Sequence, residues 1–377
     1  MNKPIYLDYM ATTPVDPRVA KKMQLYLTQD GIFGNAASSH FYGQQAKAAN
    51  DNARDQIATL LNTNPKNIIW TSGATEANNL AIKGIMYFYQ HQGNHIIICK
   101  TEHKSVLDTC KYLETQGFKV TYLTPKADGL IDLYTLEQAL RPETILASIM
   151  HVNNEIGVIQ DIAAIGDLLR TRGVLLHVDA TQSVGKIPID LQKLKIDLMS
   201  FSGHKIYGPK GIGALYLRPK LHLAPQIHGG EQEQGVRSGT LATHQIVGLG
   251  EALHLASQEM LQENQRLLAL RQRLWQALQN LSNVYLNGSL TKRIAGNLNI
   301  SFSDIDSELL LAALPALALS TAATCTKEPS HVLKALDVPH DLVLNTIRIS
   351  IGRFTSEAEI DFTARYITEI VTKLRTK

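Results

Sequence analysis

One lysine in a glycine-rich turn is the residue of this chain best placed to act as a nucleophile. Lys205 follows the apolar run Asp197–Ser202 and precedes Gly208-Pro209-Lys210-Gly211-Ile212-Gly213. Glycine and proline allow the backbone to bend sharply after the lysine. A lysine that loses part of its water has a lowered pKa, and its neutral amine can form a Schiff base with an aldehyde cofactor. The alternative is a solvated lysine in an ordinary surface turn.

Four other segments place polar groups directly after apolar, strand-like runs. Asp179 ends one run and can keep a pyridine-type ring nitrogen protonated, or simply cap a turn. His103 follows another and offers an imidazole for ring stacking or proton transfer, or only for loop hydrogen bonds. Thr71-Ser72-Gly73-Ala74-Thr75-Glu76 opens a helix as an anion site or a plain helix cap. Asn153-Asn154-Glu155 offers amide donors to a ring oxygen or a carboxylate.

An arginine and a cysteine in the last part of the chain complete the candidates. Arg353 can clamp a substrate carboxylate with two N–H groups, or lie on the surface. Cys325 lies among small and polar residues without core periodicity, which predicts an exposed thiol, and an exposed thiolate is a nucleophile. Cys99 and Cys110, in a strand and a helix, are interpreted as packing residues.

Short apolar runs and amphipathic stretches alternate from residue 68 onward. This alternation predicts an α/β domain with a mostly parallel sheet, whose ligand lies beyond the carboxyl ends of the strands. A long helical pattern, Thr243–Leu281, leaves this domain, and Val284–Lys377 indicates a smaller α+β domain. We therefore expect a large domain of residues 14–260 and a small one of residues 1–13 and 261–377. The predicted strands of the large domain are Ile68–Trp70, His95–Cys99, Lys119–Leu123, Ile145–His151, Leu175–Asp179, Leu198–Ser202 and Ala214–Leu217.

The composition disfavours several other classes of protein. The 377 residues carry 37 basic and 34 acidic side chains, and their net charge of +3 includes no basic block. We therefore expect neither nucleic-acid nor membrane binding. The opening Met1-Asn2-Lys3-Pro4 has no apolar signal segment, and three scattered cysteines indicate neither a disulfide framework nor a metal site. The expected location is cytoplasmic. The glycines after Lys205 lack the Gly-Lys-Ser/Thr ending of a nucleotide-binding P-loop.

Taken together, these segments resemble the cysteine desulfurases, which are pyridoxal-phosphate enzymes of the class V aminotransferase group. The resemblance covers almost the whole chain, includes Tyr6-Leu7-Asp8-Tyr9 and the segment Gly229–Thr240, and is most specific over His151–Gly213. It is closest to the group I, housekeeping iron–sulfur type. It implies the type I fold of pyridoxal-phosphate transferases, with the catalytic cysteine loop in the small domain. It also implies pyridoxal 5′-phosphate as cofactor and L-cysteine as substrate.

The resemblance implies how the cofactor would be held. Lys205 would carry it and later move the α-proton, His103 would stack on its ring and assist proton transfer, and Asp179 would hold the ring nitrogen. Gln182 would reach the phenolic oxygen of the ring. The neighbouring subunit of a homodimer would supply Thr240 to the phosphate. Within the subunit, the phosphate site would consist of residues from a helix start and from the lysine turn: Ala74, Thr75, Ser202, Gly203 and His204.

The resemblance also implies the substrate contacts and the path of the sulfur. Asn154 and Arg353 would orient the substrate carboxylate, and Asn154 would also lie against the cofactor. Cys325 would take the sulfur as a persulfide while alanine leaves. The acceptor would be an iron–sulfur scaffold or a tRNA-thiolation carrier. Alternatives that keep this fold are a selenocysteine lyase, another pyridoxal-phosphate C–S lyase, or a weakly active homologue that binds partners.

The chain departs from the group I pattern around Cys325 and at its end. Glu328-Pro329-Ser330 arrives about three residues early, and Ser320–Lys327 contains no glycine. A shorter segment without glycine sweeps less space, so we expect a shorter reach for sulfur delivery. Housekeeping members typically continue beyond the position of Lys377 into a tail that helps to bind the scaffold. The sequence therefore leaves the sulfur acceptor open.

Overall fold

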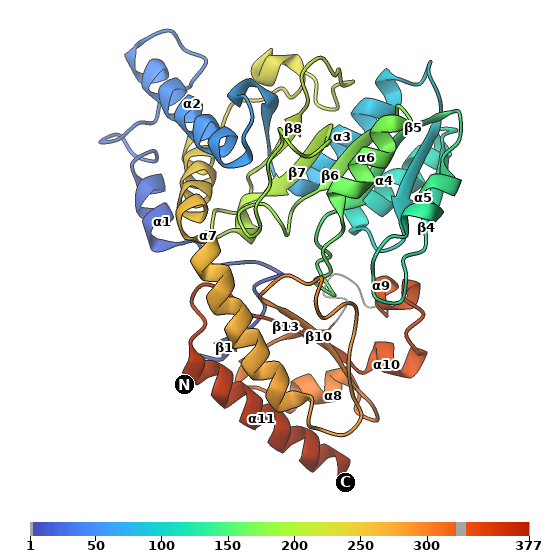
Figure 1. The fold of residues 1–377 in the computed structure, drawn as a ribbon. Helices are drawn as coiled ribbons and strands as arrows, with labels where there is room; N and C mark the ends of the chain where they lie inside the picture. The colour runs from blue at the N-terminus through green and yellow to red at the C-terminus, as the bar shows by residue number, and fades with distance from the viewer. Residues whose placement is uncertain (1–2, 322–328, 377) are drawn as a thin grey trace.

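The computed structural model describes residues 3–321 and 329–376 (Figure 1). In this part of the chain, a seven-stranded sheet has the order β2-β8-β7-β6-β5-β3-β4. β8 runs antiparallel to both of its neighbours, and the other pairs are parallel. The predicted mostly parallel sheet is therefore confirmed. Its strands are β2 Ile68–Thr71, β3 His95–Cys99, β4 Lys119–Leu123, β5 Thr144–Met150, β6 Leu175–Asp179, β7 Leu198–Ser202 and β8 Gly213–Leu217.

Helices cover both faces of this sheet, which explains why its strands are continuous apolar runs rather than alternating ones. Ile97 packs on one face with residues of α2, α5, α6 and α7, whereas its neighbours Ile96 and Ile98 pack on the other face with α3 and α4. This division follows from the two-residue period of a strand. The covering helices are α2 Phe41–Leu61, α3 Ala74–Phe88, α4 Lys104–Thr115, α5 Leu133–Ala139, α6 Ile162–Thr171 and α7 Thr243–Leu278.

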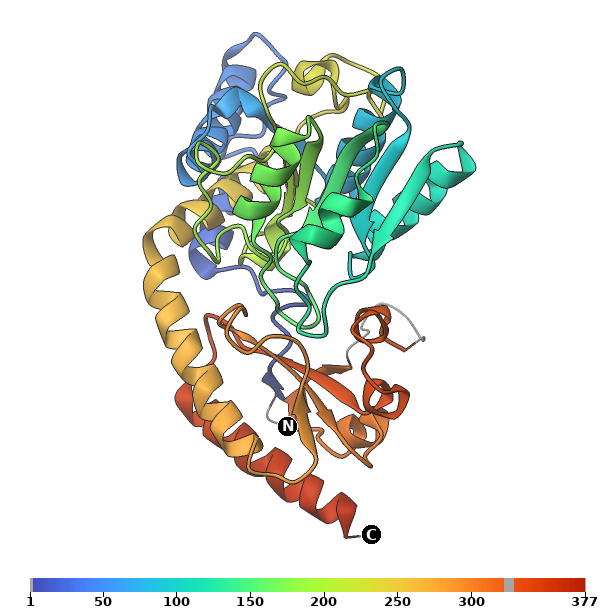
Figure 2. The same ribbon diagram turned by 45° about the vertical axis from the view of Figure 1, so that its right-hand side comes forward.

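The long helix α7 connects the large domain to a second core (Figure 2). Its first half buries Leu249 and Leu253 against the sheet, and its second half buries Leu270 and Leu274 in the small domain. Residue 260 lies between these two sets of leucines, so we propose residue 260 as the boundary between the large and the small domain.

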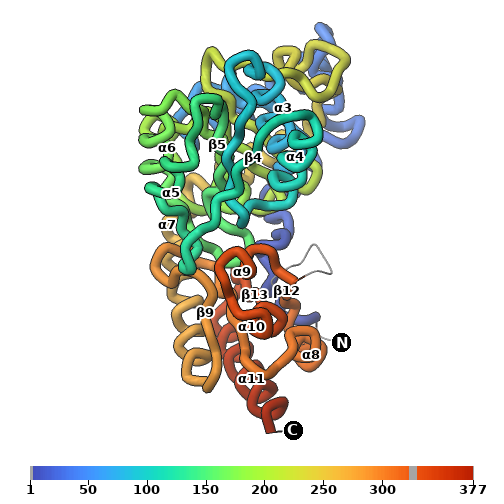
Figure 3. The backbone as a smooth tube through the Cα atoms, turned by 90° about the vertical axis from the view of Figure 1, so that its right-hand side faces the viewer, coloured from blue at the N-terminus to red at the C-terminus, as the bar shows by residue number. Residues whose placement is uncertain are grey.

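The small domain is built on an antiparallel sheet of order β12-β13-β10-β9, backed by α7 and α11. The N-terminal strand β1 pairs with β11, which places the start of the chain in this domain (Figure 3). The capping box of Ser356 and Glu359 fixes the start of α11. The strands are β1 Ile5–Tyr6, β9 Val284–Leu286, β10 Asn297–Phe302, β11 Leu317–Ala318, β12 Ser320–Thr321 and β13 Thr346–Ser350.

The remaining elements are short, apart from the closing helix. They are α1 Pro17–Gln24, α8 Ser307–Ala312, α9 His331–Ala335, α10 His340–Leu344, α11 Glu357–Arg375 and the 3₁₀ turns η1 Pro65–Asn67, η2 Gly203–Lys205 and η3 Gln232–Gly235. None of the helices in the described ranges is both long and apolar enough to cross a lipid bilayer.

Candidate active site

A cavity of about 530 Å³ lies where the carboxyl ends of β5, β6 and β7 meet the small domain. The loop after β5 forms part of this junction, because Asn297 and Asn299 of β10 donate hydrogen bonds to the carbonyl oxygen of Glu155 at 3.1 and 3.3 Å. The structure brings most of the predicted site residues to this one space. Those that line it are Ala74, Thr75, His103, Asn154, Asp179, Gln182, Ser202, His204 and Lys205.

Lys205 enters the cavity from η2, directly after β7. Its Nζ donates hydrogen bonds to the carbonyl oxygens of Met10 and Ala11 at 2.8 and 2.6 Å. Gly203 supports the turn through its backbone, since its N–H donates to Ile212 O at 3.0 Å and a Cβ at this position would lie 2.8 Å from Pro209 O. The glycine thus permits the close approach that turns the lysine into the cavity.

Asp179, at the end of β6, is 3% exposed and surrounded by donors. Asn78 Nδ2 donates to its Oδ2 at 2.9 Å, and Thr181 donates to its Oδ1 through Oγ1 at 2.5 Å and N–H at 3.0 Å. These three hydrogen bonds fix the orientation of the carboxylate. A carboxylate in this position can hold a protonated ring nitrogen.

His103 caps the N-terminus of α4 and lines the same cavity. Its Nδ1 accepts the Ser105 N–H at 3.1 Å, which places the ring proton on Nε2. Burial lowers the pKa of His103, while Asp179 opposes this effect and Lys205 adds to it. The imidazole is therefore neutral near pH 7 and can accept a proton.

The start of α3 provides donors for a phosphate. The first N–H groups of a helix have no partner within it, and they attract anions. The turn before α3 holds Gly73 at φ +154°, which residues with a Cβ rarely adopt, and a Cβ on Gly213 would lie only 2.7 Å from the Gly73 Cα, so the close approach requires glycine at both positions. Burial lowers the pKa of His204 to about 4, which keeps its ring neutral. Together with the Thr75 and Ser202 hydroxyls, these groups fit a phosphate-bearing aldehyde.

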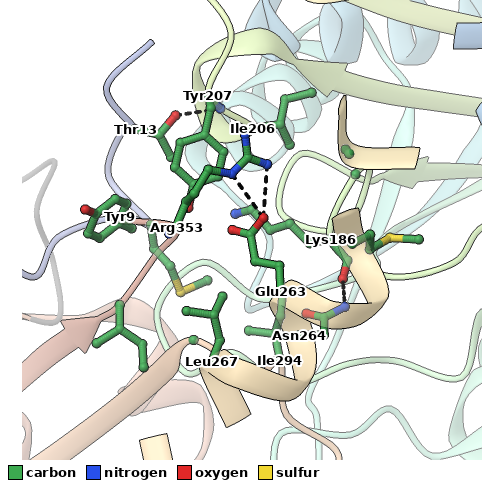
Figure 4. Close-up of a pocket in the computed structure, with 16 residues that line it drawn as sticks. Tyr9, Thr13, Lys186, Ile206, Tyr207, Glu263, Asn264, Leu267, Ile294 and Arg353 are labelled. Atoms are coloured by element: carbon green, nitrogen blue, oxygen red, sulfur yellow. Dashed lines mark hydrogen bonds and ion pairs between the residues drawn. The ribbon is translucent and has the colours of Figure 1, made fainter. Parts of the chain in front are cut away.

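The structure corrects the prediction for Arg353, which does not line this cavity. Its Nη1 donates to Asp16 at 2.7 Å and its Nη2 to Glu263 at 3.0 Å. Its guanidinium also lies 4.2 Å from the centroid of the Tyr207 ring (Figure 4). These contacts hold Arg353 beside a second, smaller cavity, because two carboxylates and an aromatic face surround the guanidinium there.

Arg348, which the sequence analysis missed, is the arginine that lines the larger cavity. Its Nη1 donates to Asn154 O and its Nη2 to Asp8 Oδ1, both at 2.8 Å. The sequence contained a signal for this placement. Ile347 and Ile349 belong to the small-domain core, and strand alternation turns Arg348 to the opposite face.

Two further residues of the cavity wall were not predicted. Glu155 accepts a hydrogen bond from Ser330 Oγ at 2.5 Å, and burial raises its pKa to about 7. His331 donates through Nε2 to Glu102 O at 3.0 Å. Glu155 directly follows Asn154 in a segment that was already a candidate, so sequence reasoning could have found it. His331 lies in the small domain, and its sequence neighbours gave no such signal.

Two predicted residues lie elsewhere. Thr240 lines a separate cavity of about 400 Å³, together with Asn50, Arg54 and Glu233. Cys325 lies in residues 322–328, outside the described residues. Cys99 and Cys110 are buried and free, as predicted for packing residues, and burial raises the pKa of the Cys99 thiol to about 12. In the described ranges, His, Cys, Asp and Glu side chains form no group of three or more that could hold a metal ion.

Comparisons with known proteins agree with this geometry. Residues 5–362 match the aminotransferase class-V family. The chain is 57% identical over 381 residues to "Cysteine desulfurase IscS" of Aeromonas hydrophila subsp. hydrophila, covering 100% of this chain and 94% of that protein. A solved NifS-like protein has a TM-score of 0.92 at 36% identity, with 98% of this chain and 99% of that chain covered. SspA, solved in complex with cysteine, has a TM-score of 0.83 at 38% identity, with 93% and 100% covered.

The α/β fold, with an amine, an imidazole and a carboxylate around one cavity, defines a pyridoxal-phosphate-dependent enzyme. The chain belongs to the class-V aminotransferase family, where it groups with the housekeeping cysteine desulfurases.

Proposed function

We propose that this chain converts L-cysteine to L-alanine and transfers the sulfur to Cys325 as a persulfide, for use in iron–sulfur cluster assembly. The observation that carries the proposal is the common cavity of Lys205, His103, Asp179 and Arg348. These groups provide an amine for an aldehyde, a proton acceptor, a partner for a ring nitrogen and a cation for a carboxylate. An L-amino acid bound to pyridoxal 5′-phosphate needs all four.

The cofactor site would use the residues already placed at strand ends. Pyridoxal 5′-phosphate, when bound, supplies an electron sink for bond breaking at the substrate Cα. The first turn of α3, Ser202 and His204 would hold its phosphate, and Asp179 its ring nitrogen. Gln182 would donate to its phenolic oxygen. Lys205 would hold its aldehyde carbon, and the Met10 and Ala11 carbonyls orient the lysine amine.

The substrate carboxylate would bind Arg348 in place of Arg353. Arg348 lies beside Asn154, which would donate its side-chain amide to the same carboxylate or to the ring. A guanidinium fork matches the two oxygens of a carboxylate. With the carboxylate held there, Lys205 would take the α-proton and return a proton to the alanine carbon. The neutral imidazole of His103 would take the proton of the substrate thiol.

The sulfur step would depend on Cys325. Its Sγ thiolate would bond to the substrate sulfur while the Cβ–S bond breaks, and the electron pair of that bond would stay with carbon and end in alanine after protonation. Described residues on both sides of residues 322–328 support this assignment. Ser320 pairs with Arg348 across β12 and β13, and Ser330 donates to Glu155 in the cavity wall. Because this thiol must stay reduced, we also propose a cytoplasmic location.

The proposed enzyme would be a homodimer whose partner completes the phosphate site with Thr240. Asn50 supports this, since its side-chain N and O atoms are buried beside Thr240 without a hydrogen-bond partner. A group of exposed apolar side chains also lies nearby at the start of α2 and the segment before it, where the Phe33 and Tyr42 rings are 5.3 Å apart. Apolar groups of this kind are typical of protein interfaces. The group comprises Leu25, Leu27, Phe33, Phe41 and Tyr42.

The activity is tested by incubating the cofactor-loaded protein with L-cysteine and a thiol reductant. We expect alanine and sulfide in equal amounts. Pyruvate and ammonia would indicate a different C–S lyase, and a strong preference for selenocysteine would indicate a selenocysteine lyase. Cys325→Ser should abolish sulfide release but leave the cofactor bound and coloured. Loss of colour together with activity would contradict the assigned role of Cys325.

The sulfur acceptor is tested with ³⁵S-cysteine. We expect label on Cys325 in the wild-type protein and its passage to a purified iron–sulfur scaffold protein. Passage only to a tRNA-thiolation carrier would replace the proposed acceptor.

The shared site is tested by mixing two inactive variants. Lys205→Ala lacks the amine, and Thr240→Arg blocks the proposed phosphate contact. If Thr240 acts across the interface, mixed dimers contain one site with both native residues, and the mixture recovers part of the activity. Absence of recovery in demonstrated mixed dimers would place Thr240 in its own subunit's site or outside any site.

A further inference from the structure

The small cavity beside Arg353 lies behind the Lys205 turn and has a volume of about 40 Å³ (Figure 4). Such a space has room for little more than a water molecule, so it is not a substrate site. Its wall nevertheless contains several ionisable side chains from both domains. Those labelled in Figure 4 include Tyr9, Lys186, Tyr207, Glu263 and Arg353.

Lys186 connects this small cavity to the large one. Its side chain lines the small cavity, and its Nζ donates a hydrogen bond to Gln182 Oε1 at 2.8 Å. Gln182 is 2% exposed and lines the large cavity. Its Nε2 donates to Met10 O at 2.9 Å, and the same carbonyl accepts the Lys205 Nζ at 2.8 Å. A continuous series of hydrogen bonds thus joins the two lysines.

The direction of these hydrogen bonds fixes the Gln182 amide. A lysine side chain bound in this way donates, so the amide atom that faces Lys186 must be the oxygen. The amide nitrogen then faces Met10 and the large cavity, with N–H donors available there. Loss of Lys186 would leave Oε1 without its donor in a buried place and leave the amide orientation to the Met10 contact alone.

We propose that Lys186 is a positioning residue that acts through Gln182. It holds the amide with its donors toward the cofactor, and it sets how the Met10 carbonyl is shared between Gln182 and the Lys205 amine. The inference deepens the proposed function, on which it rests, because Gln182 is the group that would reach the phenolic oxygen of pyridoxal 5′-phosphate.

Burial and nearby charges set the protonation state of Lys186. Burial lowers the pKa of Lys186 to about 7, and the nearby Lys205 cation adds to this effect. Glu263 on α7 acts in the opposite direction, and Arg348 on β13 lowers the pKa further. Arg353 faces the same cavity from the segment after β13. Lys186 is therefore largely neutral above pH 7, so it acts on Gln182 through its N–H donor rather than through its charge.

Two substitutions test the hydrogen bond. Lys186→Met removes the N–H donor to Gln182, whereas Lys186→Gln keeps one. Asn264→Ala is the matched control, since Asn264 Nδ2 donates to the Lys186 backbone carbonyl in the same cavity wall but does not contact Gln182.

The first measurement is the rate at which cofactor-free protein takes up pyridoxal 5′-phosphate above pH 7. We expect slower uptake in Lys186→Met, because the Met10 carbonyl that binds the Lys205 amine is then shared differently with Gln182, and near-wild-type uptake in Lys186→Gln. The control should keep the wild-type rate. The second measurement is the absorbance spectrum of the bound cofactor, which we expect to shift in Lys186→Met and to return toward wild type in Lys186→Gln.

A wild-type uptake rate and a wild-type spectrum in Lys186→Met would overturn the proposal, even if the variant were less stable. The same holds if Asn264→Ala shifted both as much as Lys186→Met. If Lys186→Met did not fold, Lys186→Ala, which also lacks the donor, would take its place, and a wild-type rate and spectrum in that variant would overturn the proposal. Neither measurement needs L-cysteine turnover. A wild-type protein that binds the cofactor but makes no alanine would therefore refute the proposed reaction and leave this test valid.

Discussion

The two cavities on either side of the Lys205 turn each contain an arginine, but the two guanidinium groups have different partners. In the larger one, Arg348 bonds to Asp8 and the Asn154 carbonyl and still faces a space of about 530 Å³. In the smaller one, Arg353 is held by Asp16, Glu263 and the Tyr207 ring. The Arg353 guanidinium, between two carboxylates, stabilises the junction of the two domains, whereas the Arg348 guanidinium lines the cavity in which we propose that the substrate carboxylate binds.

Replacing Arg348 should produce the largest loss of activity. Arg348→Met removes the proposed partner of the substrate carboxylate, and we expect kcat/KM for L-cysteine to fall by at least about 100-fold, roughly 3 kcal/mol. Arg348→Lys keeps the charge without the two-pronged geometry and should fall in between. Steady-state kinetics of cofactor-saturated protein measure this. A loss below fivefold in Arg348→Met would remove the distinction between the two arginines.

Replacing Arg353 should affect stability instead. Arg353→Met removes a cation that pairs with Asp16 and Glu263 in a mostly buried place. We expect the free energy of unfolding to fall by about 3 kcal/mol. KM for L-cysteine should stay within about threefold of wild type. Denaturant unfolding and kinetics on the same preparations test both parts. A large rise in KM with unchanged stability would return Arg353 to the substrate site.

The protonation of Glu155, in the wall of the larger cavity, should make the stability of the protein depend on pH. Burial raises its pKa from 4.5 to about 7, so between these values the folded protein keeps a proton that the unfolded chain has lost. The unfolded state then binds fewer protons, and stability falls as pH rises through this window. In Glu155→Gln this contribution is absent. We expect the wild type to lose about 2 to 3 kcal/mol relative to the variant between pH 4.5 and 7.

Denaturant unfolding at several pH values measures this difference. Glu369→Gln, at an exposed position of α11, is the matched control and should show no such trend. Parallel curves for wild type and Glu155→Gln would mean that Glu155 does not hold its proton.

Tyr207→Phe should give the smallest effect. The Tyr207 hydroxyl accepts a hydrogen bond from the backbone N–H of Arg353 at 2.6 Å, so removal of the hydroxyl should lower the free energy of unfolding by about 1 kcal/mol. The ring would still stack on the guanidinium, and cofactor uptake should be unchanged. Denaturant unfolding and the uptake rate check this. A slower uptake would show that the small cavity acts on Lys205 through Tyr207 as well as through Lys186.

Much of the fold was accessible from the sequence, because both its helical and its strand periods are clear there. The predicted strands His95–Cys99 and Leu175–Asp179 have the bounds that the structure gives them. The predicted long helix to Leu281 ends at Leu278. The short elements α8, α9 and α10 were not predicted, since five or six residues contain too little of a helical period to recognise.

The site residues that lie at the ends of strands could be predicted from the sequence. Parallel strands end at one edge of a sheet, so Asp179, His103 and Lys205 had to lie near one another once the sheet was predicted. The alternation in β13, Thr346-Ile347-Arg348-Ile349-Ser350, also indicated that Arg348 points away from the core, although the sequence analysis assigned the substrate carboxylate to Arg353. The Lys186–Gln182 contact, four residues apart in a turn, gave no such signal.

The sequence by itself determined which groups stand at the ends of the strands, because hydrophobic periodicity and the direction of the chain are local properties. Only the tertiary structure decided which arginine faces the large cavity and which is enclosed by carboxylates. The partners of Arg353 come from residues 16 and 263, and those of Arg348 from residues 8 and 154. Asp8 and Glu263 belong to the small domain, whereas Asp16 and Asn154 belong to the large one, so each arginine has all of its partners only after the two domains pack.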